Sequence, residues 1–361
     1  MAGCFTLHPP GRPRTFFERN KWPVGGSFRF GGALSGEPLR IGQDAPFPWF
    51  GGKRRVASIA WGAMGNCPGY IEPFAGSLAV MLRRPHAPKV ETVNDKDAYV
   101  SNFWRAVQAD PEAVARHADW PVNETDLFAR HLWLVNSGRE RIAKLEEDPD
   151  HFDAQVAGWW VWGVCAWIGS GWCAGTGPWQ LPHLSNPGQG VNRKLPHLGD
   201  PGRGYQRSTE ALVIWMTELS ERLRKVRVCC GDWRRVLTSS VIRGGGYPCG
   251  IFLDPPYDTG SENYSTTETG IAAQVREWAI ENGDDKRLRI VLCGYDGEGE
   301  MPSHWTEHAY SATGAYAGKG IQAHENRHRE RMWFSPGCLR PNEVPSLFAN
   351  ERKSNAEESA A

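Results

Sequence analysis

Short apolar runs alternate with longer segments of helical spacing through most of the chain. The runs that suit strands lie at 70–72, 90–95, 226–233, 251–253, 289–294 and 331–334. Apolar residues recur at helical spacing in 56–61, 78–82, 96–108, 111–117, 126–135, 155–167, 208–224 and 268–282. The alternation predicts an α/β fold with a parallel sheet, helices on both faces, and the carboxyl ends of the strands along one edge.

The run at 251–253 is followed directly by Asp254-Pro255-Pro256-Tyr257. A strand cannot continue through two prolines, because each lacks a backbone N–H and has a fixed φ. The chain must therefore turn and present Asp254 and Tyr257 at the side where open α/β sheets bind ligands. A carboxylate, rigid carbonyls and a flat ring suit a planar group with an amino donor, although the same residues also fit an ordinary turn.

Acids end three further predicted strands. Glu72 precedes a small-residue turn that contains Gly76, the arrangement of the first unit of a nucleotide-binding α/β fold. Asp95 ends the next strand, where its two oxygens suit both hydroxyls of a ribose, and Asn94-Asp95 also suits a helix N-cap. Asp232, followed by Trp233, adds a third acceptor. Together these acids predict a ligand cleft at one edge of the sheet.

Composition narrows the class of protein. The 361 residues carry 41 basic and 41 acidic side chains, so any surface for nucleic acid must be local. There is no run of eighteen apolar residues and no apolar signal core at the N-terminus, so we expect a cytoplasmic protein. Nine cysteines without a CxxC pair predict free thiols and no zinc site.

The chain divides into predicted regions by composition. Residues 1–44 and 340–361 are expected to be a disordered arm and tail, and 105–225 a mainly helical and loop insert between 45–104 and 226–339. The tryptophans of 158–168 are expected in a buried helix, with base stacking as a second interpretation.

The loop 178–207 has a local excess of positive charge that suits phosphates. It carries four basic residues and one acid, Asp200; the basic residues are Arg193, Lys194, Arg203 and Arg207.

Glycines that would bind phosphates are sparse. The GxGxxG motif and the P-loop are both absent, which disfavours a dinucleotide or ATP and an NAD-dependent oxidoreductase. A nucleoside without phosphates remains compatible with Glu72, Gly76 and Asp95, and S-adenosylmethionine fits that description.

Four motifs together resemble the Dam-type DNA adenine methyltransferases, in the order and rough spacing of that family. They are Trp49-Phe50-Gly51-Gly52-Lys53, Glu72-Pro73-Phe74-Ala75-Gly76, Asn94-Asp95 and Asp254-Pro255-Pro256-Tyr257. The resemblance covers about 46–104 and 226–336. It implies a Rossmann-like S-adenosylmethionine methyltransferase sheet, with 105–225 as the target-recognition domain.

The resemblance also implies roles for residues on the cofactor side. Asp95 would hold the ribose hydroxyls, Phe74 and Gly76 would lie under the methionine part, and Asp232 and Trp233 would flank the cofactor adenine. Trp49 and Lys53 would contact the cofactor or brace the site, with Lys53 near Asp254. One departure is Leu78, which stands where the family often has a second glycine.

On the substrate side, the resemblance implies adenine as the methyl acceptor. Asp254 and the Pro255 carbonyl would accept hydrogen bonds from the 6-amino group, and Tyr257 would stack on the ring. The base would have to be flipped out of double-stranded DNA, because a paired base is out of reach. An RNA adenine methyltransferase and a catalytically silent DNA-binding relative are the alternatives; the presence of all the acids disfavours the second.

Overall fold

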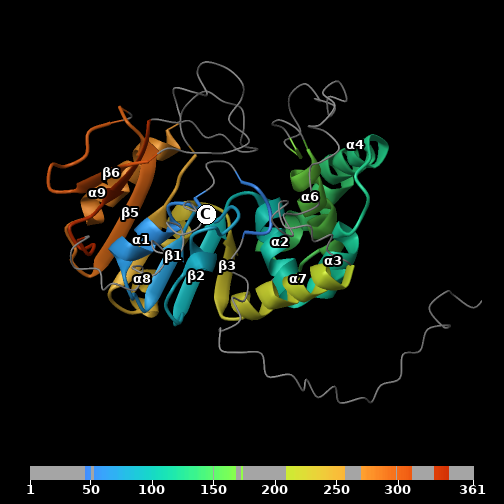
Figure 1. The fold of residues 1–361 in the computed structure, drawn as a ribbon, viewed down its shortest axis with the longest axis horizontal. Helices are drawn as coiled ribbons and strands as arrows, with labels where there is room; N and C mark the ends of the chain where they lie inside the picture. The colour runs from blue at the N-terminus through green and yellow to red at the C-terminus, as the bar shows by residue number, and fades with distance from the viewer. Residues whose placement is uncertain are drawn as a thin grey trace, which may run out of the picture. The chain divides into compact units, whose positions relative to one another are not determined.

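A mixed sheet of seven strands lies at the centre of the part of the chain that the computed structural model describes (Figure 1). The described residues are 45–49, 53–148, 150–167, 172–173, 209–256, 270–297, 299–310 and 329–340, all within one compact unit, Arg40–Ala361. The strands are β1 (Gly69–Glu72), β2 (Val90–Asp95), β3 (Val226–Cys230), β4 (Cys249–Leu253), β5 (Leu288–Tyr295), β6 (Thr306–Ala309) and β7 (Glu330–Phe334).

The strand order is β3-β2-β1-β4-β5-β7-β6. The first five strands in this order pair in parallel, and β7 is antiparallel to both β5 and β6. In the register, Asp95 at the end of β2 lies opposite Cys230 at the end of β3. The carboxyl ends of β1, β2, β3 and β4 therefore meet at one edge, as the sequence predicts.

Helices surround the sheet. They are α1 (Ala57–Met64), α2 (Ala98–Ala109), α3 (Pro111–Ala118), α4 (Glu124–Trp133), α5 (Arg139–Ile142), α6 (Ala154–Ala166), α7 (Thr209–Leu223), α8 (Ser239–Gly245) and α9 (Ile271–Asn282). Shorter helical turns are η2 (Met81–Arg83), η3 (Leu134–Gly138), η4 (Ala143–Glu146) and η6 (Trp233–Val236). Asp97, Asp110, Asn123 and Asp153 cap α2, α3, α4 and α6 by accepting a backbone N–H.

The two faces of the sheet are covered by different helices because side chains alternate along each strand. Tyr70, Phe252 and Val291 pack in one buried cluster with α1, α2 and α7. Ile251 and Ile290 point the other way, into a second cluster with α8 and α9. The predicted α/β sheet with helices on both faces is thus confirmed.

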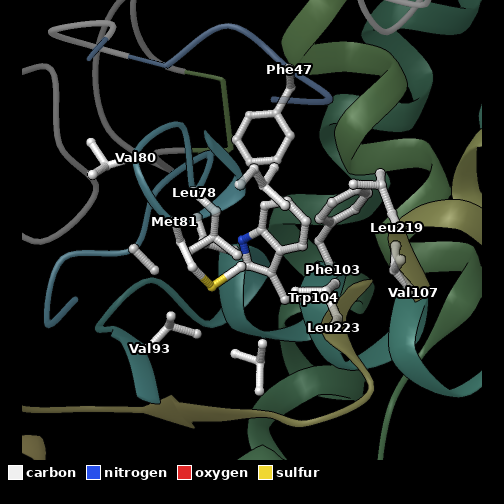
Figure 2. Packing of buried hydrophobic residues seen from close by; sticks show 14 of the residues in the cluster. Phe47, Leu78, Val80, Met81, Val93, Phe103, Trp104, Val107, Leu219 and Leu223 are labelled. Atoms are coloured by element: carbon white, nitrogen blue, oxygen red, sulfur yellow. The ribbon is translucent and has the colours of Figure 1, made fainter. Parts of the chain in front are cut away.

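Aromatic rings fill the first face beside β2. Phe47, Phe103 and Trp104 pack together (Figure 2): the ring centroids of Phe47 and Phe103 are 5.3 Å apart, and those of Phe103 and Trp104 are 4.9 Å apart. Phe47 also packs against Trp160, with ring centroids 5.0 Å apart. Trp160 belongs to α6, whose apolar residues are buried on most sides. The expectation that the tryptophans of this segment are mainly core residues is in line with that burial. Figure 1 shows α2, α3, α6 and α7 together on the β3 side of the sheet.

Two expectations about local structure are wrong, and one strand is missing from the sequence prediction. No regular α-helix begins at Leu78, because that residue has a left-handed φ of 55°, and a turn leads to the short η2. The cap of α2 is Asp97 rather than Asp95, which is still paired in β2. Strand β6 was not predicted from its sequence because it is a short, mostly exposed edge strand without an apolar run.

A buried cluster of charges joins β2 to α7. Both oxygens of Glu91 are paired: Oε1 lies 3.2 Å from Arg84 Nη1, and Oε2 lies 2.6 Å from Arg222 Nη1. The side chains of Glu91 and Arg84 are almost fully buried. Removal of the carboxylate would leave a buried guanidinium without its counter-charge.

We therefore expect Glu91→Ala to lower the free energy of unfolding by about 3–5 kcal/mol, the cost of breaking a buried ion pair. The matched control is Glu112→Ala on α3, because Glu112 pairs with Arg116 at 3.6 Å on the exposed surface. That change should cost no more than about 1 kcal/mol. The free energy of unfolding would be measured in urea, and an equal decrease for the two variants would contradict the stabilising role of the buried cluster.

Candidate active site

Asn94, in β2, ties together the loops that follow the neighbouring parallel strands β1 and β3. Its side-chain amide donates to the carbonyls of Pro73, at 3.1 Å, and Gly231, at 3.0 Å. Its own carbonyl accepts from Ala75 N at 2.8 Å, and Gly231 N donates to Asp95 O at 3.1 Å. The buried Asn94 therefore fixes the ends of β1 and β3 on either side of Asp95.

Asp95 is held by backbone donors on both oxygens. Gly76 N donates to Oδ2 and Asp97 N donates to Oδ1, each at 2.9 Å. Burial, with the neighbouring charge of Asp97 as the next cause, raises the pKa of Asp95 to about 7. Each carboxylate oxygen has two lone pairs, so the group can accept further hydrogen bonds in this orientation.

Gly76 lies where no side chain fits. Its φ is +45°, and a Cβ there would lie 2.4 Å from Trp49 Cδ1. Its carbonyl accepts from Trp104 Nε1 at 2.9 Å. The glycine turn, Trp49 and Asp95 thus form one packed group beside the end of β1.

Glu72 is the last residue of β1 and is buried. The Tyr70 hydroxyl donates to its Oε2 at 2.9 Å. Burial raises the pKa of Glu72 to about 8, and the negative charge of Asp254 adds to the rise. The ends of β1 and β4 therefore place two acids within electrostatic reach of each other.

Asp254 follows β4 directly and is anchored by a buried lysine. Lys53 Nζ lies 3.1 Å from Asp254 Oδ1, with side-chain exposures of 6% and 18%. The Lys53 carbonyl accepts from Val56 N and Ala57 N at the start of α1. The partial exposure of Asp254 leaves its carboxylate accessible from the strand-end edge.

Glu330 and Tyr310 also lie beside Lys53, and neither was singled out from the sequence. Lys53 Nζ lies 3.3 Å from Glu330 Oε2, which also accepts from the Tyr310 hydroxyl at 2.5 Å. The sequence contains no local signal for this contact, because Lys53 and Glu330 are 277 residues apart. Only the antiparallel pairing of β7 with β5 shows that the start of β7 lies near the site.

Asp232 and Trp233 lie after β3 and serve the local structure. Asp232 caps η6 by accepting from Arg234 N at 2.9 Å, and its carboxylate also pairs with the Arg234 guanidinium at 3.3 Å. Trp233 is buried, with its ring 6.2 Å from that of the half-buried Phe74. The structure thus brings Phe74 and Trp233 together, next to an exposed Asp232.

Several predicted site residues lie outside the described residues: Tyr257, Arg193, Lys194, Arg203 and Arg207. Phe50, Gly51 and Gly52 of the first motif also lie outside them. Of the Asp254-Pro255-Pro256-Tyr257 motif, the structure describes the first three, with Pro255 buried and Pro256 half-buried.

Comparison with known proteins matches one part of the chain to a family model. Residues 49–147 match the model of the D12 class N6 adenine-specific DNA methyltransferases. The matched segment contains Trp49, Lys53, Glu72, Gly76 and Asp95. No curated protein matches the chain. In the described part of the chain, no helix has the length and apolarity that a membrane crossing requires. The D12 methyltransferases use S-adenosylmethionine and act on DNA. Over residues 49–147, the chain is therefore similar to the D12 class of N6 adenine-specific DNA methyltransferases.

Proposed function

We propose that Asp254 and the Pro255 carbonyl are the catalytic acceptors for the 6-amino group of an adenine flipped out of double-stranded DNA. The observation that carries this proposal is the position of Asp254. It follows the parallel strand β4 directly, is partly exposed, and is anchored through Oδ1 to the buried Lys53. Pro256 keeps the turn rigid and Tyr257 stacks on the base.

The chemistry requires acceptors on the amino group. An aromatic amine is a poor nucleophile because its lone pair is delocalised into the ring. Acceptors on both N–H groups draw the nitrogen towards sp³ geometry and stabilise the positive charge that develops on it. The carboxylate of Asp254 supplies one acceptor, and the Pro255 carbonyl supplies the other. The remaining task of the site is to hold the base in position.

The residues beside β1 and β2 fit the cofactor by their donor and acceptor chemistry. S-adenosylmethionine carries hydroxyl donors and a cationic sulfonium, but no phosphate, and it supplies the methyl group. Asp95 offers oriented acceptor oxygens for the ribose hydroxyls, and the acidic Glu72 lies nearby at the end of β1. Trp49, Phe74 and Gly76 would border the rest of the cofactor, with Asp232 and Trp233 at its adenine.

Access to the base requires flipping. A base within a duplex cannot reach Asp254, so the enzyme must extrude it and offset the lost stacking. Stacking on an aromatic side chain is worth about 1–3 kcal/mol per base, which is the role we assign to Tyr257.

Recognition of the target is assigned to the insert at 105–225, between the catalytic segments 45–104 and 226–339. Its described helices α3, α4 and α6 stand beside α2 on the β3 side of the sheet (Figure 1). The basic residues of its loop would neutralise phosphates of the DNA: Arg193, Lys194, Arg203 and Arg207.

Asp254→Ala should lower the rate of methyl transfer by at least about 100- to 1,000-fold, because it removes a charged acceptor from the transition state. The measurement is transfer of labelled methyl to an adenine-containing duplex at saturating cofactor. Asp284→Ala is the control, since Asp284 is an exposed acid that pairs only at the surface with His304, at 3.0 Å. A fully active Asp254→Ala enzyme would contradict the catalytic role of Asp254.

Asp95→Asn should weaken the binding of S-adenosylmethionine by about 10- to 100-fold, because hydrogen bonds to a charged acceptor are worth about 1.5–3 kcal/mol. Burial raises the pKa of Asp95 to about 7, so protonation removes its charge as the pH falls through that value. The dissociation constant of the wild type, measured by calorimetry, should therefore rise below about pH 7. An identical rise in the variant would reject the ribose role.

Arg193→Gln combined with Lys194→Gln should reduce the salt dependence of DNA binding, by about 0.9 in the log–log slope for each phosphate that the variant no longer neutralises. Arg224→Gln with Lys225→Gln is a matched control, because this exposed Arg-Lys pair precedes β3, at the edge of the sheet away from the proposed cleft. Binding would be followed by fluorescence anisotropy at several salt concentrations. If both double variants keep the wild-type slope, the loop does not contact phosphates.

A further inference from the structure

The ammonium of Lys53 lies between two carboxylates. It is 3.1 Å from Asp254 Oδ1 and 3.3 Å from Glu330 Oε2, and Lys53 and Glu330 are both almost fully buried. Asp254 is the more exposed of the two acids. The three groups carry one positive and two negative charges when all are ionised, so the cluster has a net negative charge.

Glu330 is held more firmly than a surface acid. It is the first residue of β7, where it pairs in register with Tyr295 of β5. The Tyr310 hydroxyl donates to Oε2 at 2.5 Å, and Tyr310 N donates to the Glu330 carbonyl at 3.2 Å. Burial raises the pKa of Tyr310, so the phenol remains a donor at physiological pH.

Tyr310 also borders the lysine itself. The Lys53 ammonium lies 5.7 Å from the centroid of the Tyr310 ring, within the range of a cation–π contact. Glu330 and Tyr310 therefore restrict where the ammonium can lie, and with it the Oδ1 atom of Asp254.

We propose that Glu330, supported by Tyr310, is a positioning residue that acts on Asp254 through Lys53. Glu330 shares the charge of the ammonium, so Lys53 orients Asp254 without neutralising it. With Glu330 present, the cluster stays negative and attracts the positive charge that develops on the adenine amino group. Without it, Lys53 and Asp254 form a neutral pair, and Asp254 becomes a weaker acceptor. This inference rests on the proposed catalytic role of Asp254.

The first test is Glu330→Gln, which keeps the shape of the side chain and removes its charge. The single-turnover rate of methyl transfer should fall by about 10- to 100-fold, as is typical when a partner of an active group is removed. The dissociation constants for S-adenosylmethionine and for duplex DNA should stay unchanged. The melting temperature should fall, because a buried charge pair is broken, so the rates are compared at a temperature at which circular dichroism shows both enzymes to be folded. Tyr310→Phe should lower the rate less, in the same direction.

The matched control is Glu307→Gln. Glu307 lies on the neighbouring strand β6 and pairs at 2.9 Å with Arg331, away from Lys53. This variant should keep the wild-type rate. A Glu330→Gln enzyme with the wild-type rate, or one that loses rate only in proportion to weaker cofactor binding, would overturn the proposal.

A double-mutant cycle separates positioning through Lys53 from a general structural effect. In a Lys53→Met background, Glu330→Gln should cost little further rate, because the group through which Glu330 acts is gone. Full additivity of the two losses would overturn the proposal. Asp254→Ala separates failure of the proposed function from failure of the inference about Glu330. A fully active Asp254→Ala enzyme would contradict the proposed function. An inactive Asp254→Ala enzyme together with a fully active Glu330→Gln enzyme would contradict the role of Glu330 alone.

Discussion

Parallel pairing of β3, β2, β1, β4 and β5 is the constraint on which the site depends. It brings the residues that end β1, β2 and β4 to one edge, although they are far apart in the chain. The buried amide of Asn94 then joins the loops after β1 and β3 around Asp95. The site thus depends on backbone carbonyls and N–H groups that the sheet has already placed.

The charges of the site follow from burial at that edge. Burial raises the pKa of both Glu72 and Asp95, so each retains a proton at a higher pH than a surface acid would. Asp254 has a counter-charge beside it, because the buried ammonium of Lys53 lies 3.1 Å from its Oδ1 atom. In the proposed function, these acids would favour a cationic cofactor and the positive charge that develops on the substrate.

The sequence predicts the fold well because its strands are apolar runs that end in recognisable turns, as at Asp254-Pro255 and at Gly76. It fails where structure depends on distant contacts. Leu78 has an apolar side chain of the kind found in helices, yet its left-handed backbone ends that pattern. β6 is an exposed edge strand held by pairing with β7. Glu330 reaches Lys53 across 277 residues, and no local pattern reveals such a contact.

The most direct test is to identify the methylated base. The full-length protein would be incubated with labelled S-adenosylmethionine and mixed-sequence duplex DNA, with RNA of matched sequence in parallel. The product nucleosides would be separated and identified by mass spectrometry, and the modified positions mapped. N6-methyladenine is expected in the duplex DNA at a defined short site. Label on cytosine, or on the RNA alone, would contradict it.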